Sequence, residues 1–255
     1  MNRFLFGVAQ AVTETFDLPE PIVEIGSYQV EGQEAVRLRS LFPGRDYTGI
    51  DMRAGPGVDC VANVENLPQE TGSVGTVIAM STFEHVRQFW RGFDEVQRVL
   101  RPDGIFLVAC PFFFRIHNYP HDYWRFTPAA FESLLESYPS KIIGWHGARQ
   151  RPSNVWSVAL GPDRPPITQE QFVRHRLLVQ KYAYEPAGSL SRPWLYRFAG
   201  LFCGRGPFAS YLDRNRWDAV CLNADPEQPK VTRLRVRVRE HITDSPLPRP
   251  LNSAK

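Results

Sequence analysis

The stretch Ile22-Val-Glu-Ile-Gly26 decides the fold class of this chain. Its branched apolar residues form the near-continuous run of a strand covered on both faces, and Gly26 permits a sharp turn at the strand's end. Downstream, Tyr47-Thr-Gly-Ile-Asp51 repeats the pattern and ends in an aspartate. A carboxylate at the end of the second strand can accept hydrogen bonds from both hydroxyls of a ribose.

The turn after the first strand departs from the dinucleotide pattern. Gly26-Ser27-Tyr28 stands where that pattern has Gly-x-Gly, so a pyrophosphate would have to pass where a tyrosine side chain begins. A ribose signal without a phosphate signal favours a nucleoside ligand over NAD or FAD.

Strand and helix patterns alternate through the first two-thirds of the chain. Helices are expected near residues 31–41, 87–100 and 128–137, and further strands near 58–64, 74–80, 104–110, 141–145 and 155–160. The segment 52–58 is too short and too rich in Gly and Pro for a crossover helix, so a loop is expected there. This alternation predicts an α/β fold with a doubly wound, mostly parallel, Rossmann-like sheet.

Six segments, in order over about residues 20–161, carry a resemblance to the class I S-adenosylmethionine-dependent methyltransferases, in particular the small bacterial ones of methyltransferase type 11. They are Val23–Ser27, Tyr47–Met52, Asn63–Pro68, Phe83–Val86, Glu95–Gly104 and His121–Thr127. The resemblance implies seven strands with the last antiparallel, and S-adenosyl-L-methionine as cofactor. Two departures are a glycine-rich loop reduced to Gly26 and Gly32, and Asn63 where an aspartate is usual.

The ligand of such a sheet lies at the carboxyl ends of its strands. The residues expected to bind the cofactor are Glu24, Gly26, Ser27, Tyr28, Asp51, Met52, Asn63, Val64, Met80 and Ser81. By resemblance, Asp51 holds the ribose hydroxyls, Met52 packs on adenine, Asn63 or Val64 meets the adenine edge, and Gly26 lies under the methionine part. The alternative for each is an ordinary turn residue.

Residues 110–127 form a loop dense in aromatic side chains, and it is expected to cover the methyl acceptor. The catalytic candidates are His117, His121 and Asp122, and the acceptor-binding candidates are Glu84, His85, Tyr123, Trp124 and Arg125. The resemblance favours His117 over His121. In the structural alternative, Asp122 and Arg125 pair as a lock and Thr127 caps the next helix. No metal is predicted, because Glu84, His85, His117, His121 and Asp122 include no ligand pair with a rigid spacing on one element.

Composition narrows the class of protein. Of the 255 residues, 43% are hydrophobic, which is enough for one sizeable core. The 30 basic and 27 acidic residues nearly balance, so the net charge does not indicate a nucleic-acid partner. Four cysteines lack close-paired spacing and are expected to be reduced thiols. The apolar N-terminal residues are followed by acids without a small-residue cleavage site, so a short packed helix, no membrane partner and a cytoplasmic location are expected.

The character of the sequence changes near Pro162, which predicts a methyltransferase domain over 1–161 and a C-terminal extension over 162–255. Helices are expected over 168–184 and 193–202, and the second has an apolar face that needs a cover, either the domain or a second copy in a homodimer. Apolar and basic residues alternate strictly over Val231–Arg239, which predicts an edge strand. Four arginines would lie on one face of it: Arg233, Arg235, Arg237 and Arg239.

The sequence therefore predicts an S-adenosylmethionine-dependent enzyme that methylates a hydroxyl or amine of a small molecule, such as a sugar, a glycan precursor or a secondary metabolite. Methylation of RNA or protein is an alternative, supported by the arginine strand. A non-catalytic binding or scaffold module is another, supported by the thinned glycine loop.

Overall fold

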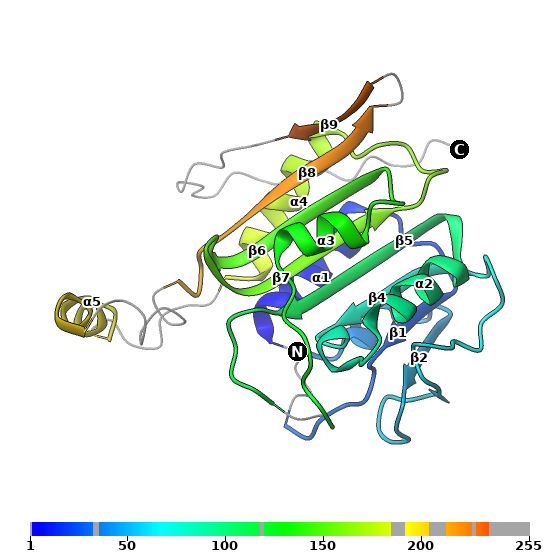
Figure 1. The fold of residues 1–255 in the computed structure, drawn as a ribbon, viewed down its shortest axis with the longest axis horizontal. Coiled ribbons are helices and arrows are strands. Elements are labelled where there is room, and N and C mark those ends of the chain that lie inside the picture. Colours follow the sequence, from blue (N-terminus) through cyan, green and yellow to red (C-terminus); the bar gives the residue numbers. More distant parts are fainter. Residues whose placement is uncertain are drawn as a thin grey trace.

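The computed structural model describes residues 2–32, 36–117, 120–184, 192–203, 213–225 and 228–234. Within these residues one sheet of nine strands runs through the molecule in the order β3-β2-β1-β4-β5-β7-β6-β8-β9 (Figure 1). The strands are β1 (Ile22–Ile25), β2 (Tyr47–Asp51), β3 (Cys60–Val61), β4 (Val74–Met80), β5 (Leu100–Pro111), β6 (Ser140–Ala148), β7 (Arg151–Leu160), β8 (Trp217–Asp225) and β9 (Gln228–Leu234).

Strand directions confirm the predicted doubly wound arrangement. β1 pairs in parallel with β2 and β4, β2 with β3, and β4 with β5. β7 is antiparallel to both of its neighbours, β5 and β6, as expected for a seventh strand. The order of the strands reverses between β1 and β4, and this switch point is where a ligand binds in open α/β sheets.

Helices cover both faces of the sheet (Figure 1). α1 (Arg3–Thr15) and α4 (Gln169–Tyr182) lie on one face, and α2 (Phe89–Val99) and α3 (Pro128–Leu134) on the other. The alternation of side chains along β5 shows why: Ile105 and Leu107 enter the first core, whereas Phe106 and Val108 enter the second. All four side chains are buried, which is the pattern that a near-continuous apolar strand predicts.

Two predicted elements are shorter than expected. The segment 31–41 contains a 3-10 helix, η2 (Leu38–Leu41), and residues 33–35 lie outside the described part. Only Leu38 is buried in η2, so there is little tertiary packing to stabilise a longer helix. β3 has two residues, because Asp59 before it accepts the Gly49 N–H and Asn63 after it begins a turn. The segment 52–58 is a loop, as predicted.

The C-terminal extension continues the sheet as well as adding helices. Phe172 and Val179 of α4 join the core formed with α1, and β8 pairs antiparallel with β6. β9 overlaps the predicted edge strand at residues 231–234, but Arg235, Arg237 and Arg239 fall outside the described residues, as does the side chain of Arg233. The boundary at residue 161 stays a prediction.

α5 (Arg192–Cys203) carries the predicted apolar face, and that face is exposed. Its members, from 62% to 79% exposed, are Trp194, Leu195, Phe198, Leu201 and Phe202. No cover is present among the described residues, and the homodimer stays a prediction.

The described helices are all too short or too polar to cross a bilayer. Cys60, Cys110 and Cys221 are free thiols, and the last two are buried.

Candidate active site

A cavity of about 960 Å³ opens at the carboxyl ends of the strands, at the switch point. All ten residues predicted to bind the cofactor line it, as do Glu84, His85, His117, His121 and Tyr123. Its volume is at the upper end of the range for small-molecule sites, about 300–1,000 Å³, so it can accommodate a nucleoside cofactor and part of a second molecule.

Gly26 shapes the floor of this cavity. Its φ of +80° lies in the left-handed region, and a Cβ here would collide with the hydroxyl and methyl of Thr82. The Thr82 hydroxyl is fixed, because it donates to the Ile25 carbonyl at 2.9 Å. The turn at the end of β1 can therefore pack against Thr82 only because position 26 has no side chain.

Gly26→Ala should lower the free energy of unfolding more than Gly44→Ala, its matched control. Gly44 has a φ of +73° but no atom within 4 Å of a built Cβ. Both variants incur the left-handed strain, about 1–2 kcal/mol, and Gly26→Ala adds overpacking of about 1–3 kcal/mol. Urea titrations measure the free energy of unfolding of each variant. Equal losses in the two variants would show that Thr82 can move aside without destabilising the protein.

Asp51 lies at the end of β2 with its carboxylate toward the loop after β1. Its oxygens accept the N–H groups of Tyr28 at 3.2 Å and of Arg53 at 3.1 Å. The Arg53 guanidinium lies over the Tyr28 ring at 4.6 Å. These contacts hold the carboxylate at the cavity wall. Met52 beside it is 56% exposed.

Two of the cavity residues are in unfavourable states: Glu24 has a shifted pKa, and Ser81 has a strained backbone. The pKa of Glu24 is raised to about 7, because burial penalises its charge more than the hydrogen bond from the Tyr47 hydroxyl, at 2.5 Å, stabilises it. Ser81 has a φ of +60°, and among the described residues it is the only non-glycine residue with a positive φ. Its N–H donates to the Ala109 carbonyl at 2.7 Å, which holds the strained turn after β4.

Three further cofactor candidates also have structural roles. Asn63 accepts the Glu65 N–H at 3.0 Å in an Asx turn, and Val64 and Met80 are both buried in the hydrophobic cores. Ser27 is buried, and its hydroxyl has no hydrogen-bond partner among the described residues.

The loop after β5 presents His117 to the cavity. Its Nδ1 lies 2.9 Å from an Asp122 oxygen, and because a carboxylate accepts, Nδ1 carries the proton and Nε2 the lone pair. Arg125 makes two hydrogen bonds to the same carboxylate, one of them of 2.7 Å. The Arg125 guanidinium holds the pKa of Asp122 well below its usual range.

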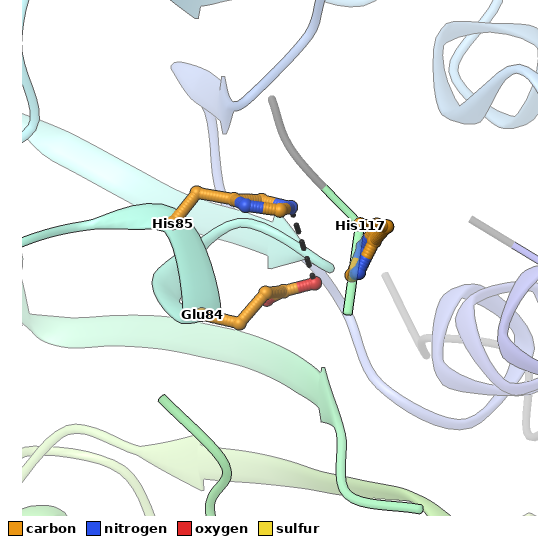
Figure 2. A group of neighbouring side chains, drawn as sticks. All are labelled: Glu84, His85 and His117. Carbon is orange, nitrogen blue, oxygen red and sulfur yellow. Dashed lines mark ion pairs between the residues drawn. The ribbon is translucent and has the colours of Figure 1, made fainter. Parts of the chain in front are cut away.

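Glu84 and His85 extend from the short 3-10 helix η3 (Phe83–His85) toward His117, as Figure 2 shows. His85 Nδ1 lies 2.6 Å from the His121 carbonyl, so this nitrogen donates and Nε2 faces a Glu84 oxygen at 3.8 Å. Glu84 is fully buried, and burial raises the pKa of its carboxyl to about 8, with a further rise from the Asp122 charge.

Three predicted site residues do not line the cavity. The Asp122 side chain is fully buried and lies against His117. Arg125 pairs with Asp122, and the Trp124 ring nitrogen donates to the Val86 carbonyl at 3.0 Å. These contacts agree with a structural role, and acceptor binding by Trp124 and Arg125 stays a prediction. Thr127 caps α3 as expected.

Several lining residues were not predicted from the sequence. Thr82 and Arg53 adjoin predicted positions, and Phe113 and Phe114 belong to the aromatic loop, so proximity could have indicated them. Others come from distant elements brought together by the pairing of the later strands, among them His146, Asn154 and Arg214. No local pattern marks them.

Comparisons with known proteins find similarity to methyltransferases. Residues 31–108 match the family model of the methyltransferase domain. The match covers less than half of the chain, and it supports an S-adenosylmethionine-dependent methyltransferase domain in that part.

The individual relatives are distant. Malonyl-[acyl-carrier protein] O-methyltransferase of Geobacter sulfurreducens is 30% identical over 104 residues, which span 36% of this chain and only 38% of that protein. A methyltransferase of Thermotoga maritima is 18% identical, with a TM-score of 0.45 over 62% of this chain and 89% of its own. The 1,6-didemethyltoxoflavin-N1-methyltransferase of Burkholderia thailandensis is 15% identical, with a TM-score of 0.46 over 62% and 79%.

Proposed function

We propose that this protein transfers a methyl group from S-adenosylmethionine to a hydroxyl or amine of a small molecule. The observation that carries the proposal is one cavity lined both by every residue predicted to bind the cofactor and by the imidazoles of His85 and His117. Donor and acceptor would share this cavity, and holding them in line would supply much of the rate enhancement.

The donor supplies an electrophilic methyl group on a sulfonium. In this proposal Asp51 accepts hydrogen bonds from the ribose hydroxyls, and Gly26 leaves space for the methionine part. His117, positioned by Asp122, accepts the proton of an alcohol acceptor through Nε2. Tyr123 and Phe113 line the cavity beside it and keep water from the acceptor.

The acceptor end favours an oxygen nucleophile. An amine needs little more than deprotonation and alignment, whereas an alcohol benefits from a histidine held in one tautomer by a carboxylate, which is the arrangement of His117 and Asp122. The name of the Geobacter relative also specifies O-methylation. Methylation of RNA or protein was suggested by four arginines, of which Arg235, Arg237 and Arg239 and the side chain of Arg233 lie outside the described residues.

Asp51→Ala should weaken binding of S-adenosylhomocysteine at least about tenfold, because charge-assisted hydrogen bonds of roughly 1.5–3 kcal/mol each are lost. Calorimetry measures the affinity, and the melting temperature checks the fold. Asp94→Ala, which removes an exposed carboxylate of α2 outside the cavity, is the matched control and should bind as the parent does.

Binding as tight in Asp51→Ala as in the parent would refute the ribose assignment. A parent protein that binds neither S-adenosylmethionine nor S-adenosylhomocysteine would favour the scaffold alternative. Stabilisation by NAD comparable to that by S-adenosylhomocysteine would point to an oxidoreductase instead.

A further inference from the structure

Glu84 and His85 lie beside His117 and form with it a cluster of three ligand-type side chains, although base catalysis requires only His117. One ligand atom of each lies within 4.8 Å of the others, and in the described part of the chain this is the only group of three or more His, Cys, Asp or Glu residues so placed. Figure 2 shows the three side chains converging from η3 and from the loop after β5. No rigid ligand spacing is visible along the chain, because His117 comes from a different element than Glu84 and His85.

Both histidines have the tautomer that a metal ligand needs. His85 donates from Nδ1 to the His121 carbonyl, and His117 donates from Nδ1 to Asp122. Each Nε2 therefore carries a lone pair, and each ring is oriented by an outer partner. A hydrogen bond from the second ring nitrogen to a carbonyl or carboxylate is the usual support of a metal-binding histidine.

The Glu84 side chain indicates a missing ligand independently of the two histidines. Glu84 is fully buried, and neither of its oxygens has a partner of good hydrogen-bond geometry among the described residues. The buried thiol of Cys110 adjoins it, but a thiol is a weak donor. A buried carboxyl group without a strong partner is destabilising, and a cation that displaces its proton would satisfy it.

We propose that Glu84, His85 and His117 bind one divalent transition-metal ion at the acceptor end of the cavity. Two nitrogens and one oxygen suit Zn²⁺, Mn²⁺, Fe²⁺ or Co²⁺ better than Mg²⁺ or Ca²⁺, which prefer oxygen ligands. Three protein ligands leave at least one open position, which an oxygen of the acceptor can complete. All three residues line the cavity, so the ion has a path from solvent.

The three ligand atoms must move closer together to bind one ion. Ligands about 2.0–2.1 Å from a tetrahedral ion lie roughly 3.3 Å from one another, whereas the atoms here are separated by up to 4.8 Å. A nitrogen bound to the ion does not accept a proton, so the base role of His117 applies to the ion-free protein.

The test is titration of the chelator-treated full chain with Co²⁺, followed by visible absorption, and with Zn²⁺, followed by calorimetry. We expect one ion per chain in the parent, and a dissociation constant raised more than about 100-fold in His85→Ala and in His117→Ala. Asp122→Asn, which alters only the outer partner, should raise it about 10- to 100-fold. His121→Ala is the matched control, because its carbonyl remains, and it should bind as the parent does.

Unchanged binding in the His85→Ala/His117→Ala double variant would mean an adventitious ion only and would overturn the proposal, as would no saturable binding by the parent at millimolar metal. Mg²⁺ bound as tightly as Zn²⁺ would overturn the choice of metal class. Titrations of the same variants with S-adenosylhomocysteine separate this inference from the proposed function. Cofactor binding without metal binding refutes only the metal site, and the reverse result refutes only the proposed function.

Discussion

His117→Ala is expected to lower turnover roughly 10²- to 10⁴-fold with an alcohol acceptor in the ion-free protein, while the affinity for S-adenosylhomocysteine stays unchanged. The reason is the chain of contacts in which Arg125 holds Asp122, Asp122 holds His117 Nδ1, and Nε2 is left as the basic nitrogen. The loss should occur in the chemical step. Single-turnover rates with a chelator present separate that step from binding and release.

Asp122→Asn tests the positioning part of the same chain. It keeps the size of the side chain but no longer fixes the His117 tautomer, so turnover should fall and the pH profile should change without loss of cofactor affinity. A larger loss in His121→Ala than in His117→Ala would reverse the assignment of the base. Turnover within a few-fold of the parent in both histidine variants would mean that the enzyme only positions an acceptor that is already nucleophilic.

Glu84→Gln is expected to remove a pH dependence of stability. The pKa of Glu84 is about 8 in the folded protein against an ordinary value of 4.5, so the folded state holds this proton more tightly than the unfolded chain does. The resulting stability is fully present below about pH 4.5 and is lost as the pH rises through about 8. The loss is on the order of a few kcal/mol.

The measurement is urea unfolding at pH 5 and pH 9 with a chelator present, compared between parent and variant so that other titrating groups cancel. The parent should lose more stability than Glu84→Gln over this range. Glu136→Gln, at an exposed carboxylate in the turn after α3, is the matched control and should follow the parent. Parallel curves for the parent and Glu84→Gln would show that the buried carboxyl is not protonated in the folded state.

The fold was predictable where side chains repeat with a period that matches an element. The apolar runs of β1, β4 and β5 and the amphipathic pattern of α2 identified their elements, and Asp51 and Gly26 followed from their places at strand ends. η2 was predicted as a longer helix because local spacing does not reveal that only Leu38 would find a core. β8 was missed because its pairing with β6 depends on a long-range contact.

The site was predictable at its cofactor end and only in part at its acceptor end. Strand ends converge in any sheet of this order, so their residues could be named from the pattern alone. Within the loop after β5, sequence could not distinguish His117, which faces the cavity, from Asp122 and Arg125, which hold it from behind. The approach of His85 to His117, with ring centres 4.8 Å apart, depends on how that loop folds over η3.

The left-handed backbone of Ser81 bears on how this protein could be engineered. A non-glycine residue in this conformation costs about 1–2 kcal/mol, whereas glycine would avoid that strain and lose only part of the gain to the entropy of the unfolded chain, about 0.5–1 kcal/mol. Optimisation for thermostability alone would therefore select glycine at position 81. The same change would remove a hydroxyl from the cavity wall, so a stabilised variant obtained in this way needs its cofactor affinity checked before it is used as a scaffold.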